Sequence, residues 1–332
     1  MAADRALDPR VSHHEVAIRG RTYYYIVGTP TEACKDTVLL MHGFPDLGFG
    51  WRNQIPYLMS LGYRVIVPDS LGFGKTDAPI DPSSYTFKSV GDDIAQLVRG
   101  IVPTGKIILG GHDWGGTLVC RMAVWHKDLV KAVFAVGISY TPFLTKYVDL
   151  AELVESGAEP YSGYQLQFRG TRVEEEIKGK AGLRLFFSAM FWGKTQNGEL
   201  GFSLTDGLLF DKLSSLNRPK ILSVEEFEFY VNEYNRHGIH EPLNWYRNKR
   251  FNFDDEKILA ETNSFAIDIP VLLVKPTGDG IITDKEMEGF HLQFSQLTIR
   301  MTDSTHWALV EASQEVNLYI GEFLETFEML RP

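Results

Sequence analysis

Short apolar runs alternate with amphipathic stretches along most of this chain, and this alternation restricts the folds that it can adopt. Four of the runs have the length and composition of strands: TVLLMHG, YRVIVPD, KIILGGHD and VKAVFAVGIS. Between them lie helix-like stretches such as NQIPYLMSLG and VGDDIAQLVRGIV. Strands that alternate with helices form a mostly parallel sheet with helices on both faces. The sequence therefore predicts an α/β fold, preceded by a hairpin, HEVAIRG and TYYYIVG, that turns at Gly20.

The middle of the chain interrupts this pattern. Residues 141–247 contain few strand-like runs, many aromatic residues, and helical patterns such as LRLFFSAMFWG and VEEFEFYVNEYNRHG. The strand pattern returns in IPVLLVKPTGD and QLTIRMTDSTH, and a helical pattern runs from Trp307 to Leu330. We therefore predict a core formed by residues 1–140 and 248–332, with residues 141–247 inserted between them as a helical lid.

Composition excludes several classes of partner. The 332 residues are 44% hydrophobic and carry a formal net charge of -10 without a cluster of lysine and arginine. This charge argues against nucleic acid and against an anionic membrane surface. No apolar run reaches the length of a membrane-spanning helix, so no membrane insertion is expected. Cys34 and Cys120 are the only cysteines, which excludes a disulfide framework and favours a cytoplasmic location.

A glycine-rich turn lies between a predicted strand and a predicted helix. Its sequence is GGHDWGG, residues 110–116. In α/β folds a sharp turn at this position lifts one side chain above the carboxyl ends of the strands, where ligands bind. The side chain at the tip is often a serine in a G-x-S-x-G motif, but this sequence contains no such motif. Asp113 occupies the tip instead, which predicts a carboxylate nucleophile.

A carboxylate suits attack on an alkyl carbon. A serine would form an ether there, which a base and water do not easily open. Asp113 would form an ester, and ordinary ester hydrolysis at the Asp113 carbonyl would then release the product.

Ester hydrolysis needs a base, an acid that orients the base, and donors for an oxyanion. His306 follows the last predicted strand, and Asp279 follows the strand before it, so the chain order is nucleophile, acid, histidine. The other strand end that could supply the acid, residues 137–140, has no carboxylate. The backbone N–H groups of Phe44 and Trp114 are the predicted oxyanion donors.

Four motifs carry a resemblance to a known family: HGFPDLGFGWRNQIP, GHDWGG, YQLQF and LNWYRN. Together they resemble the soluble epoxide hydrolases of the α/β-hydrolase superfamily, over most of the chain. HGFP is shared with dehalogenases, whereas GHDWGG together with LNWYRN is more specific. One departure is KPTGDGI, where glycines flank Asp279 on both sides.

The resemblance also implies two catalytic tyrosines in the lid. In that family two lid tyrosines hold and protonate the epoxide oxygen, and the matching positions are Tyr164 and Tyr246. A tyrosine, with an ordinary pKa of about 10, is still a proton donor at neutral pH. Phe44, Trp114 and both tyrosines are then the expected substrate contacts.

The sequence thus predicts hydrolysis of a small apolar epoxide to a vicinal diol through an ester on Asp113. The first alternative is a haloalkane or haloacid dehalogenase, which shares the aspartate but would bind a departing halide with Trp114 and a second N–H donor. The second is a non-catalytic relative that acts as a binding protein. No metal or other cofactor is expected, since no metal-ligand spacing occurs and Asp69 replaces the first glycine of a phosphate loop ending at GKT. The sequence carries no signal for an oligomeric state.

Overall fold

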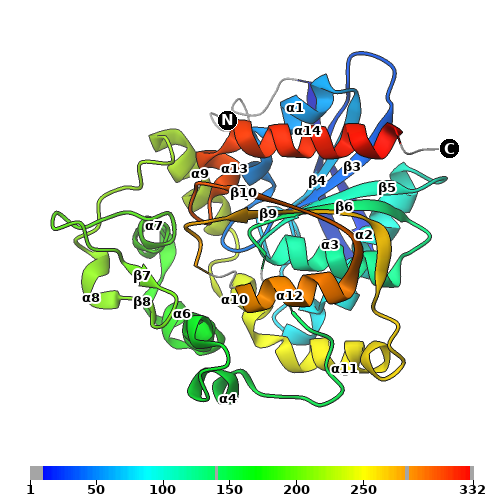
Figure 1. The fold of residues 1–332 in the computed structure, drawn as a ribbon. Helices are drawn as coiled ribbons and strands as arrows, with labels where there is room; N and C mark the ends of the chain where they lie inside the picture. Colours follow the sequence, from blue (N-terminus) through cyan, green and yellow to red (C-terminus); the bar gives the residue numbers. More distant parts are fainter. Residues whose placement is uncertain (1–9, 139–140, 281–283, 330–332) are drawn as a thin grey trace.

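The computed structural model describes residues 10–138, 141–280 and 284–329. Its main sheet has eight strands in the order β1-β2-β4-β3-β5-β6-β9-β10 (Figure 1). The strands are β1 (Val11–Ile18), β2 (Arg21–Gly28), β3 (Asp36–Met41), β4 (Tyr63–Pro68), β5 (Ile107–His112), β6 (Val130–Val136), β9 (Ile267–Pro276) and β10 (Phe294–Thr302). Strand β2 pairs antiparallel with β1 and β4, and the other neighbours are parallel. The predicted α/β fold and the hairpin at Gly20 are therefore confirmed.

Helices cover both faces of the sheet, because alternate residues of the central strands face two separate hydrophobic clusters. In β3, Val38 and Leu40 belong to one cluster, whereas Leu39 and Met41 belong to the other. The helices that follow or flank the strands are α1 (Gln54–Ser60), α2 (Phe87–Ile101), α3 (Trp114–Trp125), α11 (Lys249–Glu261), α12 (Asp284–Gln293), α13 (Ala308–Glu311) and α14 (Ser313–Met329). Figure 1 shows α1 and α14 above the sheet, with α2, α3 and α12 below it.

The last helical pattern forms two helices rather than one. The sequence predicts a single helix from Trp307 to Leu330, but α13 ends at Glu311 and α14 begins at Ser313. The Glu311 carboxylate accepts hydrogen bonds from the N–H and the hydroxyl of Thr305, at 2.9 and 2.6 Å. This contact attaches the short helix α13 to the loop that carries His306. Leu330 lies outside the described residues.

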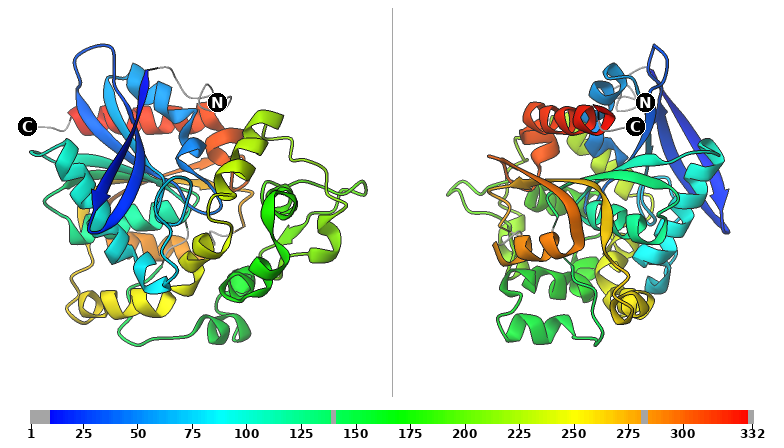
Figure 2. Two further views of the ribbon diagram at one scale, coloured as in Figure 1. Left: turned by 180° about the vertical axis from the view of Figure 1, so that it is seen from behind. Right: turned by 45° about the vertical axis from the view of Figure 1, so that its right-hand side comes forward.

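Residues 141–247 are mostly helical and lie between β6 and β9 in the chain. The elements are α4 (Leu150–Glu155), α5 (Gly163–Arg169), α6 (Arg172–Glu176), α7 (Gly179–Met190), β7 (Phe202–Ser203), β8 (Gly207–Leu208), α8 (Phe210–Leu213), α9 (Val224–Tyr234) and α10 (His240–Arg247). Short 3-10 helices occur at Gly48–Trp51, Pro82–Tyr85 and Pro160–Ser162. Figure 2 shows this green-to-yellow segment packed beside the sheet. Its buried aromatic residues join the same hydrophobic cluster as α2 and α3.

Local sequence signals set where individual helices begin. The Thr86 hydroxyl accepts the Ser89 N–H at 3.0 Å at the start of α2. At the start of α9, the Ser223 hydroxyl accepts the Glu226 N–H and the Glu226 carboxylate accepts the Ser223 N–H. Both arrangements satisfy N–H groups that have no partner within the helix.

Within the described ranges, no helix combines the length and the apolar character needed to cross a membrane.

Candidate active site

Asp113 lies at a strained turn between β5 and α3. Its φ of 53° and ψ of -129° place a non-glycine residue in a left-handed region that side chains rarely adopt. A Cβ atom on Gly115 would lie 2.3 Å from the Met41 carbonyl oxygen, and one on Gly111 would lie 2.4 Å from the Gly115 carbonyl oxygen. The glycines are therefore needed because β3, β5 and α3 approach one another closely at this turn.

Backbone N–H groups face the Asp113 carboxylate. The Phe44 N–H donates to Asp113 Oδ1 at 2.8 Å. Burial raises the pKa of Asp113 above its ordinary value, while His306 and the N–H groups of Phe44 and Trp114 act in the opposite direction. The two predicted oxyanion donors are thus both close to this carboxylate. Gly43 makes the approach possible, since a Cβ there would lie 2.2 Å from Asp113 Oδ1.

His306 lies between Asp113 and Asp279. Its Nδ1 is 2.9 Å from Asp279 Oδ2, and its Nε2 is 3.7 Å from Asp113 Oδ2. The structure therefore brings together the nucleophile, base and acid that the sequence predicts, from loops after β5, β9 and β10.

The glycines beside Asp279 have a structural reason. A Cβ on Gly278 would lie 2.9 Å from the Ser304 carbonyl oxygen, and Gly280 has a φ of +72°. Gly278 also donates its N–H to the Ser304 carbonyl at 2.9 Å. The two glycines thus lie where the loops after β9 and β10 pack closely, and this packing holds Asp279 against His306.

The two carboxylates determine the charge of His306. Burial lowers the pKa of His306, but the charge of Asp279, its hydrogen bond and the charge of Asp113 together raise it to about 9. His306 is therefore protonated at neutral pH in the free protein, where it forms an ion pair with Asp279.

Two further histidines support the backbone of the site. His112 Nε2 lies 2.9 Å from the His306 carbonyl oxygen. His42 accepts the Ser70 N–H at Nε2, at 2.8 Å, and its Nδ1 lies 2.8 Å from the Gly43 carbonyl oxygen. Burial lowers the pKa of both histidines, that of His42 to about 4. They are neutral residues that fix turns, and neither contacts the Asp113 carboxylate.

Tyr164 on α5 and Tyr246 on α10 face the site from residues 141–247. Their ring centroids are 6.0 Å apart with an interplanar angle of 75°, and the exposed fractions are 7% and 6%. Burial raises the pKa of both phenols, and the negative charge of Asp113 adds to the effect. Both side chains therefore keep their protons at neutral pH and can donate a hydrogen bond to an oxygen near Asp113.

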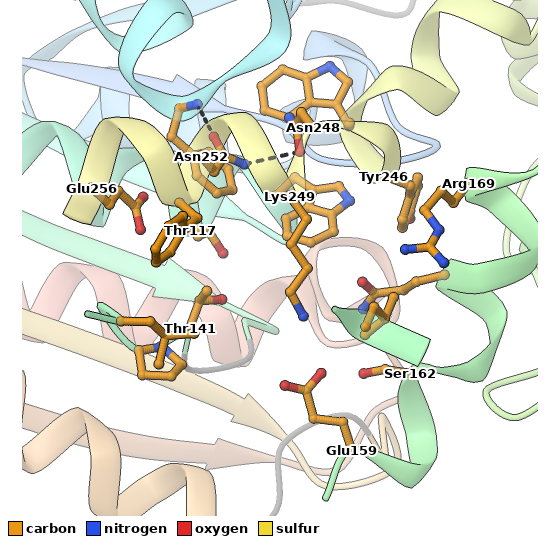
Figure 3. A pocket seen from close by; sticks show the side chains of 18 of the residues that line it. Thr117, Thr141, Glu159, Ser162, Arg169, Tyr246, Asn248, Lys249, Asn252 and Glu256 are labelled. Carbon is orange, nitrogen blue, oxygen red and sulfur yellow. Dashed lines mark hydrogen bonds between the residues drawn. The ribbon is translucent and has the colours of Figure 1, made fainter. Parts of the chain in front are cut away.

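Two cavities meet at Asp113. Asp113, Tyr164 and Tyr246 line both of them. The smaller has a volume of about 30 Å³, and its other lining residues are Phe44, Met190, Trp192, Phe202, Leu204, Asp279, His306 and Trp307. The larger has a volume of about 150 Å³ and extends toward Glu159 and Lys249 (Figure 3). Trp307, which the sequence did not single out, donates its Nε1–H to the Met190 carbonyl at 2.9 Å and so connects the His306 loop to α7.

No group of histidine, cysteine, aspartate and glutamate residues within the described ranges has the arrangement of a metal site.

The fold and the site define an α/β hydrolase. The family profile for the alpha/beta hydrolase fold matches residues 36–313, and the chain belongs to this family. The chain is 39% identical to Epoxide hydrolase srdG of Neurospora crassa, across 96% of this chain and 97% of that protein. Within the α/β hydrolases it therefore belongs to the epoxide hydrolases.

Other matches agree with this family. Bifunctional epoxide hydrolase 2 of Sus scrofa is 29% identical over 95% of this chain, which spans 56% of that longer protein. The solved structure of potato (Solanum tuberosum) epoxide hydrolase I has a TM-score of 0.78 at 23% identity, covering 95% of this chain and 99% of that one. At this identity the structural match supports the fold alone.

Proposed function

We propose that this protein hydrolyses an epoxide to a vicinal diol through a covalent ester on Asp113. The observation that carries the proposal is the position of the Asp113 carboxylate. Its Oδ1 accepts the Phe44 N–H, its Oδ2 faces His306, and two buried phenols lie across the cavity from it. This arrangement supplies a nucleophile, a base and two proton donors around one small space.

In the first step, Asp113 Oδ2 attacks an oxirane carbon while the bond from that carbon to the oxygen breaks. The departing oxygen takes a proton from the phenol of Tyr164 or Tyr246, and the phenolate that remains takes up the proton that His306 gives up, which leaves the imidazole neutral. Oδ1 becomes the carbonyl oxygen of the ester, and it already accepts a hydrogen bond from the Phe44 N–H. The product of this step is a hydroxyalkyl ester of Asp113.

In the second step, water attacks the carbonyl carbon of the ester and gives a proton to His306 Nε2. The N–H groups of Phe44 and Trp114 stabilise the oxyanion that forms on Oδ1. Collapse of this intermediate breaks the bond between the carbonyl carbon and Oδ2, and Oδ2 leaves with the diol after taking the proton that His306 holds. The carboxylic acid left on Asp113, which contains the oxygen of water, then returns its proton to His306 and becomes a carboxylate again. Asp279 holds the imidazole in the orientation that this step needs.

Ester formation prepares His306 for its role as a base. The charge of Asp113 is one of the causes that raise the pKa of His306 in the free protein. The ester has no such charge, so the pKa of His306 falls once the first step is complete. A histidine that is protonated in the free protein thereby becomes able to accept a proton from water.

Residues 141–247 act in this proposal as a lid over the reaction centre. They supply Tyr164 and Tyr246, and they cover Asp113 with apolar side chains that exclude bulk water. A site with little water strengthens each hydrogen bond to the developing alkoxide.

One observation favours a dehalogenase instead. Trp114 Nε1 is a buried N–H that makes no hydrogen bond of good geometry with a described residue, although it lies near enough to the Tyr246 hydroxyl to lower the pKa of that phenol, and it could bind a halide. However, Phe44 has no side-chain N–H to act as the second halide donor, and the two phenols have no task in that reaction. These two facts favour an epoxide over a haloalkane as the substrate.

The double variant Tyr164→Phe with Tyr246→Phe separates the two functions. We expect each single variant to lower the rate of epoxide opening about tenfold, and the double variant to lower it by a factor on the order of 1000. The measurement is single-turnover opening of styrene oxide, with 1-chlorobutane as the comparison substrate. If the double variant opens the epoxide within about tenfold of wild type, roughly 1.4 kcal/mol in the barrier, the phenols are packing residues. Turnover of 1-chlorobutane without turnover of the epoxide would instead identify a dehalogenase.

A further inference from the structure

The larger cavity, which Asp113 also lines, has further charged and hydroxyl side chains in its wall. Apolar side chains line it as well, with those of Ile138, Leu144, Val148 and Leu150 among them. Figure 3 shows the Lys249 ammonium, the Glu159 carboxylate and the Ser162 hydroxyl turned toward the same part of the cavity. An apolar substrate would pair with none of these groups.

Most charged groups that line this cavity are already paired. Arg169 contacts both carboxylate oxygens of Asp149, at 2.9 and 3.0 Å. Glu256 accepts hydrogen bonds from the buried Arg121 guanidinium, at 2.8 and 3.1 Å. Asp113 faces His306 in the reaction centre.

Two amides of the lining, those of Asn248 and Asn252, are paired as well. Asn252 accepts the Phe87 N–H at 2.9 Å and donates to Asn248 Oδ1 at 3.0 Å (Figure 3). Asn248 in turn donates to the Tyr85 carbonyl at 2.6 Å. These side chains therefore do not compete for a ligand.

Lys249 and Glu159 remain. Among the described residues neither side chain has an ion pair or a hydrogen bond, with each other or with any neighbour. Burial lowers the pKa of Lys249, and the negative charges of Glu159 and Asp149 act against this effect. A partly buried ammonium and a carboxylate that face each other across a gap favour a ligand group that pairs with both.

We propose that this enzyme acts on epoxides that carry a hydroxyl group at the end remote from the oxirane ring, and that Lys249 and Glu159 recognise this hydroxyl. A hydroxyl accepts a hydrogen bond from the ammonium and donates one to the carboxylate. Glu159 repels a carboxylate at this position, Lys249 repels an ammonium, and a methyl group leaves both charges without a partner. The inference rests on the proposed function and refines the predicted apolar substrate to one with a polar end.

The test compares four series of 1,2-epoxyalkanes that differ in the terminal group: hydroxyl, methyl, carboxylate or ammonium. Within each series the chain length is varied, and kcat/KM is measured at each length. We expect wild type to prefer the hydroxyl series by at least about tenfold at its best chain length, because a site built to bind a hydroxyl discriminates against analogues that lack it.

Two variants test the assignment of the residues. Lys249→Met leaves Glu159 alone, so the preference should move toward the ammonium series. Glu159→Gln leaves Lys249 alone, so the preference should move toward the carboxylate series. The matched controls are Lys257→Met, on the same helix α11 but half exposed, and Glu155→Gln on the exposed side of α4, and neither should change the preference.

The outcomes separate this inference from the proposed function. If the kcat/KM values of wild type for the four series lie within threefold of one another, or if wild type prefers the carboxylate series, the hydroxyl assignment is wrong. The proposal of epoxide hydrolysis is not affected by either result. Variants that fold, as judged by unchanged thermal unfolding, but keep the preference of wild type overturn the roles of Lys249 and Glu159. A protein that opens none of the four series contradicts the proposed function itself.

Discussion

At the scale of single residues, the charge of His306 depends on two buried carboxylates. Its pKa of about 9 exceeds the ordinary value of 6.5, mainly because Asp279 and Asp113 oppose the effect of burial. Because the pKa of His306 is higher in the folded chain than in the unfolded chain, protonation of His306 stabilises the fold. This stabilisation is fully present below pH 6.5 and is lost as the pH rises through 9.

This linkage predicts how stability depends on pH. The free energy of unfolding of wild type, measured relative to His306→Gln, should fall by an amount on the order of 3 kcal/mol between pH 6.5 and 9.5, since one pKa unit corresponds to about 1.4 kcal/mol. Urea unfolding of both proteins across this range checks the prediction. Parallel pH profiles for the two proteins would mean that His306 is neutral in the folded state.

The sequence predicts some of these residues better than others. Asp113, Asp279 and His306 follow strands, and the carboxyl ends of parallel strands meet at one edge of the sheet. Tyr164 and Tyr246 lie in helices of an aromatic-rich segment, where only the family resemblance distinguishes them from packing residues. Lys249 and Glu159 belong to no motif, and only the tertiary fold brings them to one cavity.

At the scale of elements, the turn from β5 to α3 decides whether Asp113 reaches its position. The paired glycines of GGHDWGG predict this tight turn, because glycine permits close backbone approach. Sequence did not predict the packing of Gly278 against Ser304, since the neighbour of a loop glycine is set by the tertiary fold.

Gly115→Ala tests the packing of the turn. A Cβ there would meet the carbonyl oxygens of Met41 and His42 at 2.3 and 2.5 Å, and neither can move without shifting β3. We expect a loss of about 2 kcal/mol or more in the free energy of unfolding, together with a loss of activity. The matched control is Gly100→Ala in α2, where the added Cβ has open space and should stabilise the helix by up to about 1 kcal/mol. Equal stability of the two variants would contradict the role given to Gly115.

At the scale of the whole molecule, residues 141–247 and the sheet share one hydrophobic cluster. Hydrogen bonds connect the two parts as well: Tyr230 donates to the buried Asp46 carboxylate at 2.6 Å, and Trp245 donates to the Leu71 carbonyl at 3.0 Å. The sequence predicts that a helical segment interrupts the strands, because its periodicity changes there. Which of its aromatic residues face Asp113 depends on how the segment packs, and periodicity does not carry that information.

In the proposed mechanism Asp113, and not water, attacks the epoxide. A single turnover in heavy-oxygen water, with enzyme in excess over the epoxide, tests it most directly. We predict an unlabelled diol and one heavy oxygen in the peptide that contains Asp113, because the diol takes its new oxygen from the carboxylate and water replaces that oxygen in the side chain. A labelled diol and an unlabelled peptide after the first turnover would show direct attack by water and contradict the covalent mechanism.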